Sequence, residues 1–131
     1  MSYFEWNKEF DLGITEMNDE HKVLISYMNT LYELSRKEAK KTSLLLAFDQ
    51  LIEFTRKHFS DEERFMDTLG YPATVHKRLH ADLLDRLDYY RGRLESGPAL
   101  LQEDFFQFLR QWLSTHICGV DQDYGRFAKK K

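Results

Sequence analysis

Apolar residues recur along most of this chain at the three- and four-residue spacing that places them on one face of an α-helix. Four such stretches, separated by short polar or glycine- and proline-containing breaks, predict helices at residues 18–37, 43–69, 72–95 and 98–118. Residues 1–17 show no sustained period and are expected to form an arm. No segment of the sequence alternates apolar and polar residues as a half-buried strand would.

The breaks contain residues that begin or end helices. Gly70 can close the second helix, and Pro72 can occupy the first turn of the third. Thr42 and Ser43 are good N-cap candidates for the second helix. Because short connections make successive helices antiparallel neighbours, the chain is predicted to be all-α: an up-down-up-down four-helix bundle with an N-terminal arm, a single domain over residues 1–131.

Composition agrees with one packed core and narrows the classes of function. The 131 residues are 42% hydrophobic and 15% aromatic, as in a globular domain. A net charge of −3 without a basic stripe argues against a nucleic-acid partner. The sequence shows no apolar run for a membrane span, no secretion-signal pattern, and one cysteine, which cannot form an internal disulfide. A cytoplasmic protein without a membrane partner is therefore expected.

Ionisable residues also lie on the apolar stripes, although unpaired polar groups are costly in a core. The positions are His21, His58, Glu62, His76, His80 and His116. In the predicted bundle, the starts of the first and third helices meet the ends of the second and fourth. All six positions fall at this end, and Asp121 follows just beyond the last stripe. A lone buried histidine is usually a hydrogen-bonded core residue, but six residues at one level need a common explanation.

The spacing within this set suits metal ligands. Two pairs lie four residues apart, on one helix face about one turn from each other: His58 with Glu62, and His76 with His80. His116 and Asp121 are five residues apart and would diverge on a continuous α-helix. The fourth helix is therefore expected to end between them, where Gly119 permits a change of direction.

Neutral imidazole together with carboxylate suits iron and related first-row metals. If two octahedral irons share the pocket, twelve coordination positions are available. The five imidazoles, Glu62 and Asp121 as bridges, and one bridging hydroxide or oxide fill eleven of them. The ion with two histidines keeps an open position, where a small diatomic ligand would bind.

These motifs resemble the hemerythrin family, and more closely its single-domain bacterial members, which are four-helix bundles. The resemblance spans nearly the whole chain and is carried by Trp6-Asn7, Gly13-Ile14, His21, His58, Glu62-Glu63, Met66, Gly70-Tyr71-Pro72, His76, His80, Trp112-Leu113, His116-Ile117, Asp121 and Tyr124. Each short motif is weak alone, whereas seven ligands in this order and spacing form a specific signal.

The resemblance implies a role for each ligand and a function for the chain. A six-coordinate iron would be held by His76, His80 and His116, and a five-coordinate iron by His21 and His58. Glu62, Asp121 and an oxo or hydroxo group would bridge the two ions. Members of the family bind dioxygen reversibly, as a hydroperoxide on the five-coordinate iron. The resemblance thus implies oxygen storage, delivery or scavenging, with dioxygen as the ligand, rather than an enzyme.

Several further residues bear on this interpretation. Phe59, Trp112 and Ile117 are expected to form a dry wall around the site. Asn18 stands where the family often has an acid, and we expect it to cap the first helix. Between the last two ligands, Cys118 is expected to be an inert buried thiol, and Gly119 to leave the oxygen pocket roomier than a leucine would.

Two other functions stay open. One is an oxygen or redox sensor module that acts through a separate protein partner. The other is a diiron oxidase or peroxidase, but ferritin-like oxidases carry carboxylate-rich sets with Glu-x-x-His pairs. This chain is rich in histidine and has the reversed order, His58 before Glu62, which favours the carrier. The sequence names no protein partner and is compatible with a monomer.

Overall fold

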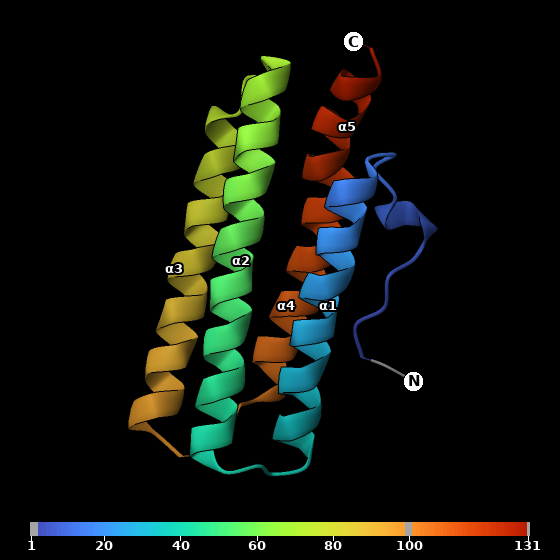
Figure 1. Cartoon of the computed structure of the whole chain (residues 1–131). Coiled ribbons are helices and arrows are strands. Elements are labelled where there is room, and N and C mark those ends of the chain that lie inside the picture. Colours follow the sequence, from blue (N-terminus) through green and yellow to red (C-terminus); the bar gives the residue numbers. More distant parts are fainter. Residues whose placement is uncertain (1–2, 99–100, 131) are drawn as a thin grey trace.

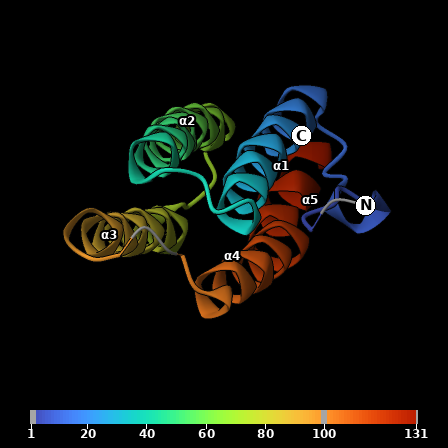
Figure 2. The same ribbon diagram turned by 90° about the horizontal axis from the view of Figure 1, so that it is seen from below.

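The computed structural model describes residues 3–98 and 101–130, which contain helices and no strands. The elements are η1 (Lys8–Phe10), α1 (Thr15–Arg36), α2 (Lys41–Leu69), α3 (Thr74–Ser96), α4 (Glu103–Thr115), the π-helical turn η2 (His116–Val120) and α5 (Asp121–Lys129). Since α4, η2 and α5 follow one another without a gap, they form one rod beside α1, α2 and α3 (Figure 1). With α1, α2 and α3 it makes four rods, and Figure 2 shows them gathered side by side in a bundle when seen from below. The predicted all-α bundle is therefore confirmed.

Several helix ends differ from the sequence expectation. The first helix begins at Thr15, after Ile14 in an extended conformation. The second begins at Lys41 with Lys40 at the N-cap, so the proposed caps Thr42 and Ser43 lie inside its first turn. The third begins at Thr74, beyond the proline expected to open it. By contrast, Gly70 does end α2, in the left-handed conformation (φ 71°) that glycine adopts readily.

Asn18 lies inside α1 and does not cap it, because the helix begins at Thr15. Its Oδ1 accepts a hydrogen bond from the Leu12 backbone N–H at 3.0 Å, and its Nδ2 donates to Asp11 Oδ1 at 2.8 Å. The expected capping role is therefore wrong. Asn18 instead holds the arm against the start of the first helix.

The arm runs along α1 and reaches α5 (Figure 1). Phe4 is buried, and its backbone N–H and carbonyl both bond to the Asn29 side chain, at 2.9 and 2.8 Å. Further along, Leu12 packs so close to Gly125 that a Cβ there would lie 3.2 Å from the Leu12 carbonyl oxygen. The arm is thus part of the packed structure, from Asn29 of α1 to Gly125 of α5.

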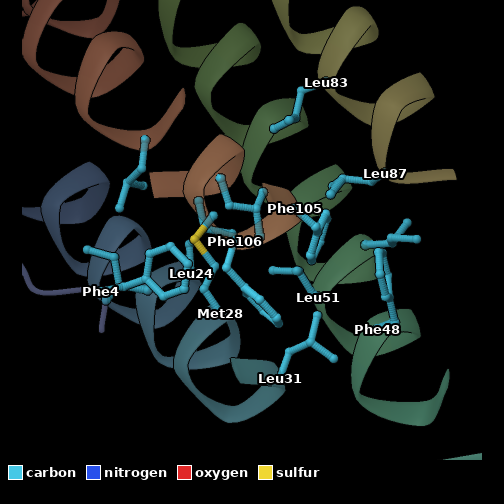
Figure 3. Packing of buried hydrophobic residues seen from close by; sticks show 14 of the residues in the cluster. Phe4, Leu24, Met28, Leu31, Phe48, Leu51, Leu83, Leu87, Phe105 and Phe106 are labelled. Atoms are coloured by element: carbon cyan, nitrogen blue, oxygen red, sulfur yellow. The ribbon is translucent and has the colours of Figure 1, made fainter. Parts of the chain in front are cut away.

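Two apolar clusters fill the interior. The larger, which we call the main core, draws on all four rods and the arm; its central side chains are Phe4, Leu24, Met28, Leu31, Phe48, Leu51, Leu83, Leu87, Phe105 and Phe106 (Figure 3). The smaller cluster comprises Leu12, Met17, Met66, Ala73 and Tyr124. Along α1, for example, His21 falls between Met17 of one cluster and Leu24 of the other. In the other rods the ionisable residues likewise lie toward the junction of the two clusters, with Phe59 and Ile117 of the main core interleaved among them. The ionisable residues therefore form a layer between the clusters.

Among the described residues, no helix combines the length and apolar character that spanning a membrane requires.

Candidate metal centre

The structure brings all seven predicted ligand residues together in one buried layer, which we call the polar layer. They are His21 on α1, His58 and Glu62 on α2, His76 and His80 on α3, His116 on η2, and Asp121 at the start of α5. None of the seven is more than 4% exposed, and the two carboxylate residues are fully buried. The helix breaks predicted that these residues lie at one height along the bundle, and the structure places them there.

The turn between His116 and Asp121 is a π-helix, not a helix end. The backbone N–H of Asp121 bonds to the carbonyl of His116, five residues earlier. Such a turn is wider than an α-helical one, so residues five apart face the same side. As a result, His116 Nε2 lies 3.0 Å from Asp121 Oδ1. The expectation that the fourth helix ends at Gly119 is wrong, because the rod continues to Lys129.

Gly119 lies at the surface of this turn and does not line the site. It is exposed, and a Cβ added there would meet no atom within 4 Å. The structure thus gives no support to the expectation that it widens a pocket beside the metal ligands. Cys118 is half-buried against the main core. Burial raises the pKa of its thiol, which favours the unreactive protonated form.

One oxygen of each carboxylate lies beside two members of a group of three histidines. Glu62 Oε1 lies 2.9 Å from His80 Nε2 and 3.4 Å from His76 Nε2. Asp121 Oδ1 lies 2.9 Å from His76 Nε2 and 3.0 Å from His116 Nε2. The Nε2 atoms of His76 and His116 are themselves only 3.2 Å apart. We call His76, His80 and His116 the three-histidine group.

The other oxygen of each carboxylate faces a second group, His21 and His58, which we call the two-histidine group. Glu62 Oε2 lies 3.5 Å from His21 Nε2 and 3.6 Å from His58 Nε2. Asp121 Oδ2 lies 3.2 Å from His21 Nε2. Both carboxylates therefore turn one oxygen to each histidine group, as a carboxylate between two cations would.

These donor atoms fit a metal better than they fit one another. Ligand atoms at about 2.1 Å from a first-row ion, and at right angles, lie about 3 Å apart, close to the distances observed here. Several buried atoms make no well-directed hydrogen bond to any described residue; they include both ring nitrogens of His21, His80 Nε2, Glu62 Oε1 and both oxygens of Asp121. Buried polar atoms without partners are costly, so a cation between them would remove that cost.

The negative charge of the two buried carboxylates also favours a bound cation in the polar layer. No lysine or arginine is buried among the described residues. Burial acts to lower the pKa of His21 and of His76, but the nearby carboxylates of Asp121 and Glu62 outweigh it and raise both values to about 9. Burial likewise acts to raise the pKa of Glu62, but the surrounding histidines hold it well below its usual value. Without metal, His21 and His76 therefore help to neutralise the carboxylates by binding protons, which metal ions would displace.

Two further carboxylates orient two of the predicted ligand rings from outside. His58 Nδ1 donates to Glu20 Oε1 at 2.7 Å, and His80 Nδ1 donates to Glu63 Oε2 at 2.8 Å. Such bonds fix the tautomer and point Nε2 into the site. Sequence reasoning missed both roles. Each acid adjoins one ligand in the chain but serves a histidine on a neighbouring helix, so only the packing of the helices reveals it.

Tyr124 is a third residue whose contact sequence reasoning missed, although it belongs to the motifs of the resemblance. Its hydroxyl donates to Glu62 Oε2 at 2.6 Å, and the side chain is fully buried. Burial, and then the charges of Glu62 and Asp121, raise the pKa of Tyr124 far above its usual value. The phenol therefore stays protonated and remains a donor.

Aromatic rings cover the faces of two of the predicted ligand imidazoles. Phe59 stacks on His80 with ring centroids 3.7 Å apart, and Trp112 stacks on His116 at 4.5 Å. Phe59 and Ile117 are buried and Trp112 is half-buried. These three residues were expected to form an apolar wall: Phe59 and Trp112 do pack beside the three-histidine group, and Ile117 is buried in the main core.

Comparison with known proteins gives a consistent result. Residues 12–128 match the family model described as the hemerythrin HHE cation binding domain. The chain is 29% identical to the bacteriohemerythrin of Stenotrophomonas maltophilia (strain R551-3), over 98% of this chain and 84% of that protein. It is 32% identical to a hemerythrin-like protein of Naegleria gruberi, over 94% of this chain and 92% of the relative.

Solved structures show the same fold. The chain superposes on a crystal structure of wild-type hemerythrin with a TM-score of 0.87 at 28% identity, covering 95% of this chain and 97% of the other. A hemerythrin point mutant gives a TM-score of 0.88 at 27% identity, covering 97% and 98% of the two chains. The matched family model, the four-rod bundle and the histidine–carboxylate cluster agree: the chain belongs to the hemerythrin family.

Proposed function

We propose that this chain holds two iron ions in the polar layer and binds dioxygen reversibly, as an oxygen storage, delivery or scavenging protein. The ligands would be His21, His58, Glu62, His76, His80, His116 and Asp121. The observation that carries this proposal is that each of two buried carboxylates turns one oxygen to each of two histidine groups. The bound iron pair would supply the electrons that hold dioxygen and recover them on its release.

The donor set supports iron over softer or harder ions. It combines five imidazoles with two carboxylates, a mixture that suits borderline first-row metals. No thiolate belongs to either group of potential ligands found in the described residues. Magnesium and calcium prefer ligand sets made only of oxygen atoms, so this histidine-rich set does not suit them either.

The surrounding residues support a carrier that is not an enzyme. Glu20 and Glu63 hold two ligand rings in place, and Phe59 with Ile117 keeps the neighbouring space apolar. A dry, rigid site favours return of the ligand over side reactions with water. The low number of carboxylates also provides little anionic support for the high-valent iron that oxidases use. A cytoplasmic location belongs to the same proposal and is supported by the single cysteine.

The test is to measure iron in the purified chain and to follow its visible spectrum. The protein would be reduced without oxygen, exposed to air and then deoxygenated. We expect two irons per chain and an absorption band that appears in air and disappears when oxygen is removed. Iron well below this stoichiometry would contradict the site, whereas a spectrum that never reverses, or turnover of an added reductant, would contradict the carrier.

A further inference from the structure

The Tyr124 hydroxyl is a buried polar group to which the proposed function assigns no role. It comes from α5 and crosses the interior to reach Glu62 on α2. Its ring is held edge-on by Phe65 and Tyr71, with centroids at 6.0 and 6.4 Å. The phenol is therefore fixed in place by packing before any metal binds.

The two oxygens of Glu62 have different surroundings. Oε1 lies 2.9 Å from its nearest histidine nitrogen, on His80, whereas the histidine nitrogens nearest Oε2 are at 3.5 and 3.6 Å. The close partner of Oε2 is instead the Tyr124 hydroxyl at 2.6 Å, the distance of a strong O–H···O⁻ bond. Tyr124 thus contacts the oxygen that faces the two-histidine group.

A carboxylate next to one cation has two choices. It can chelate that cation with both oxygens, or it can bind through one oxygen and leave the other for a second cation. Rotation of the carboxylate group decides between these arrangements, and in glutamate this torsion is soft. A hydrogen bond to one oxygen removes that freedom.

We propose that Tyr124 is a positioning residue that keeps Glu62 bridging rather than chelating, and thereby sets the affinity of the two-histidine group for the second metal ion. With the phenol in place, Oε2 stays turned toward His21 and His58 when the three-histidine group is loaded. Without it, both oxygens of Glu62 can turn to the first ion, and the second position loses a donor. This inference rests on the metal pair of the proposed function but not on oxygen binding.

The experiment is a calorimetric titration of the metal-free full-length chain with ferrous iron in the absence of oxygen. The wild-type chain is expected to bind two ions in two steps. In Tyr124→Phe, the second step should weaken by about 10- to 100-fold, the usual effect of losing an outer partner of a ligand. The first step should change by less than about threefold, because Oε1 keeps its place beside His80. His58→Ala should abolish the second step and so identify it.

Tyr71→Phe is the matched control. It removes the hydroxyl of the ring beside Tyr124, and the structure gives this hydroxyl no hydrogen bond to another described residue. Both binding steps should stay as in the wild-type chain. A purely structural role of Tyr124 would weaken both steps alike and lower the melting temperature of the metal-free chain.

Three outcomes would overturn the inference: an unchanged second step in Tyr124→Phe, an equal loss in both steps, or a second step that tightens. A wild-type chain that loads fewer than two ions would overturn both this inference and the proposed function. If two ions load in two steps but dioxygen does not bind reversibly, only the proposed function fails.

Discussion

The main core and the polar layer lie in the same four rods but are stabilised in different ways. In the main core, side chains such as Phe48, Leu51 and Phe105 are at most 1% exposed and need only apolar neighbours of suitable size. In the polar layer, each buried nitrogen or oxygen needs a partner in a defined direction. The main core can therefore form from protein alone, whereas the polar layer is left with unpaired atoms or extra protons until cations bind.

The largest expected effect on stability comes from breaking the main core. Phe105 contacts Phe48, Phe106 and Tyr90, with ring centroids 4.8–5.4 Å apart. Phe105→Ala should lower the free energy of unfolding by about 3–5 kcal/mol, because it removes apolar contacts and leaves a cavity. Denaturant titration should show this loss with and without metal, and Leu46→Ala, at a position 61% exposed, should change little. A loss seen only in the metal-loaded protein would contradict the independence of the main core.

The next largest effect is expected from a rise in pH, which should destabilise the polar layer but not the main core. The pKa values of His21 and His76 in the metal-free fold, about 9, exceed the ordinary histidine value of 6.5. A raised pKa stabilises the folded state below the unfolded value, and this contribution is lost as the pH rises through the folded value. The metal-free chain should therefore lose stability between pH 6.5 and 9.

Metal should remove this pH dependence, because bound ions replace the protons on the histidines. Melting temperatures measured across this pH range, with and without metal, would check the prediction. Proton release on metal addition, measured at pH 7 in weakly buffered solution, should accompany it. A metal-free chain whose melting temperature rises from pH 6.5 to 9 would show that His21 and His76 do not neutralise the buried carboxylates.

Removing an outer partner of a ligand should have a smaller effect, confined to the polar layer. Glu63→Gln replaces the carboxylate that accepts from His80 Nδ1. We expect metal affinity to fall by about 10- to 100-fold, since the ring is less well oriented and less basic. Because Glu63 is half-buried at the edge of the site, the free energy of unfolding of the metal-free chain should change little. Isothermal titration of wild-type and variant chains gives both affinities, and equal values would rule out the orienting role.

The smallest effect is expected from a substitution of Gly119, which lies in the π-helical turn but on its exposed side, away from both the main core and the polar layer. Alanine there meets open space and disfavours helix less than glycine does. Gly119→Ala should therefore stabilise the chain by at most about 1 kcal/mol and leave metal content and affinity unchanged. A change in either of the metal measurements would mean that this turn is coupled to the site more closely than the exposed position indicates.

Much of this architecture could be predicted from the sequence, because the governing signals are local. The apolar stripes specify four rods, and the breaks between them place all the histidines at one end. What the sequence did not reveal depends on contacts between rods or on backbone geometry of low intrinsic preference. Glu20 and Glu63 act on histidines of other helices. The five-residue spacing of His116 and Asp121 fits a π-helical turn, yet a helix end explained it equally well until the backbone was known.

The start of α1 shows the same limit at a single residue, Asn18. Asn18 is a common N-cap residue next to a helical stripe, and sequence preference alone favours that role. In the structure its side chain instead bonds to Leu12 and Asp11, because the helix extends back to Thr15. Helix propensity is a weak local preference, and tertiary packing overrides it at such boundaries.

The most direct test of the account is a crystal structure of the iron-loaded chain, with anomalous scattering recorded at the iron absorption edge. We predict two anomalous peaks, one among His76, His80 and His116 and one beside His21 and His58. Glu62 and Asp121 should each contact both ions. A single peak, or peaks outside the polar layer, would contradict the claim that these two carboxylates hold a metal pair.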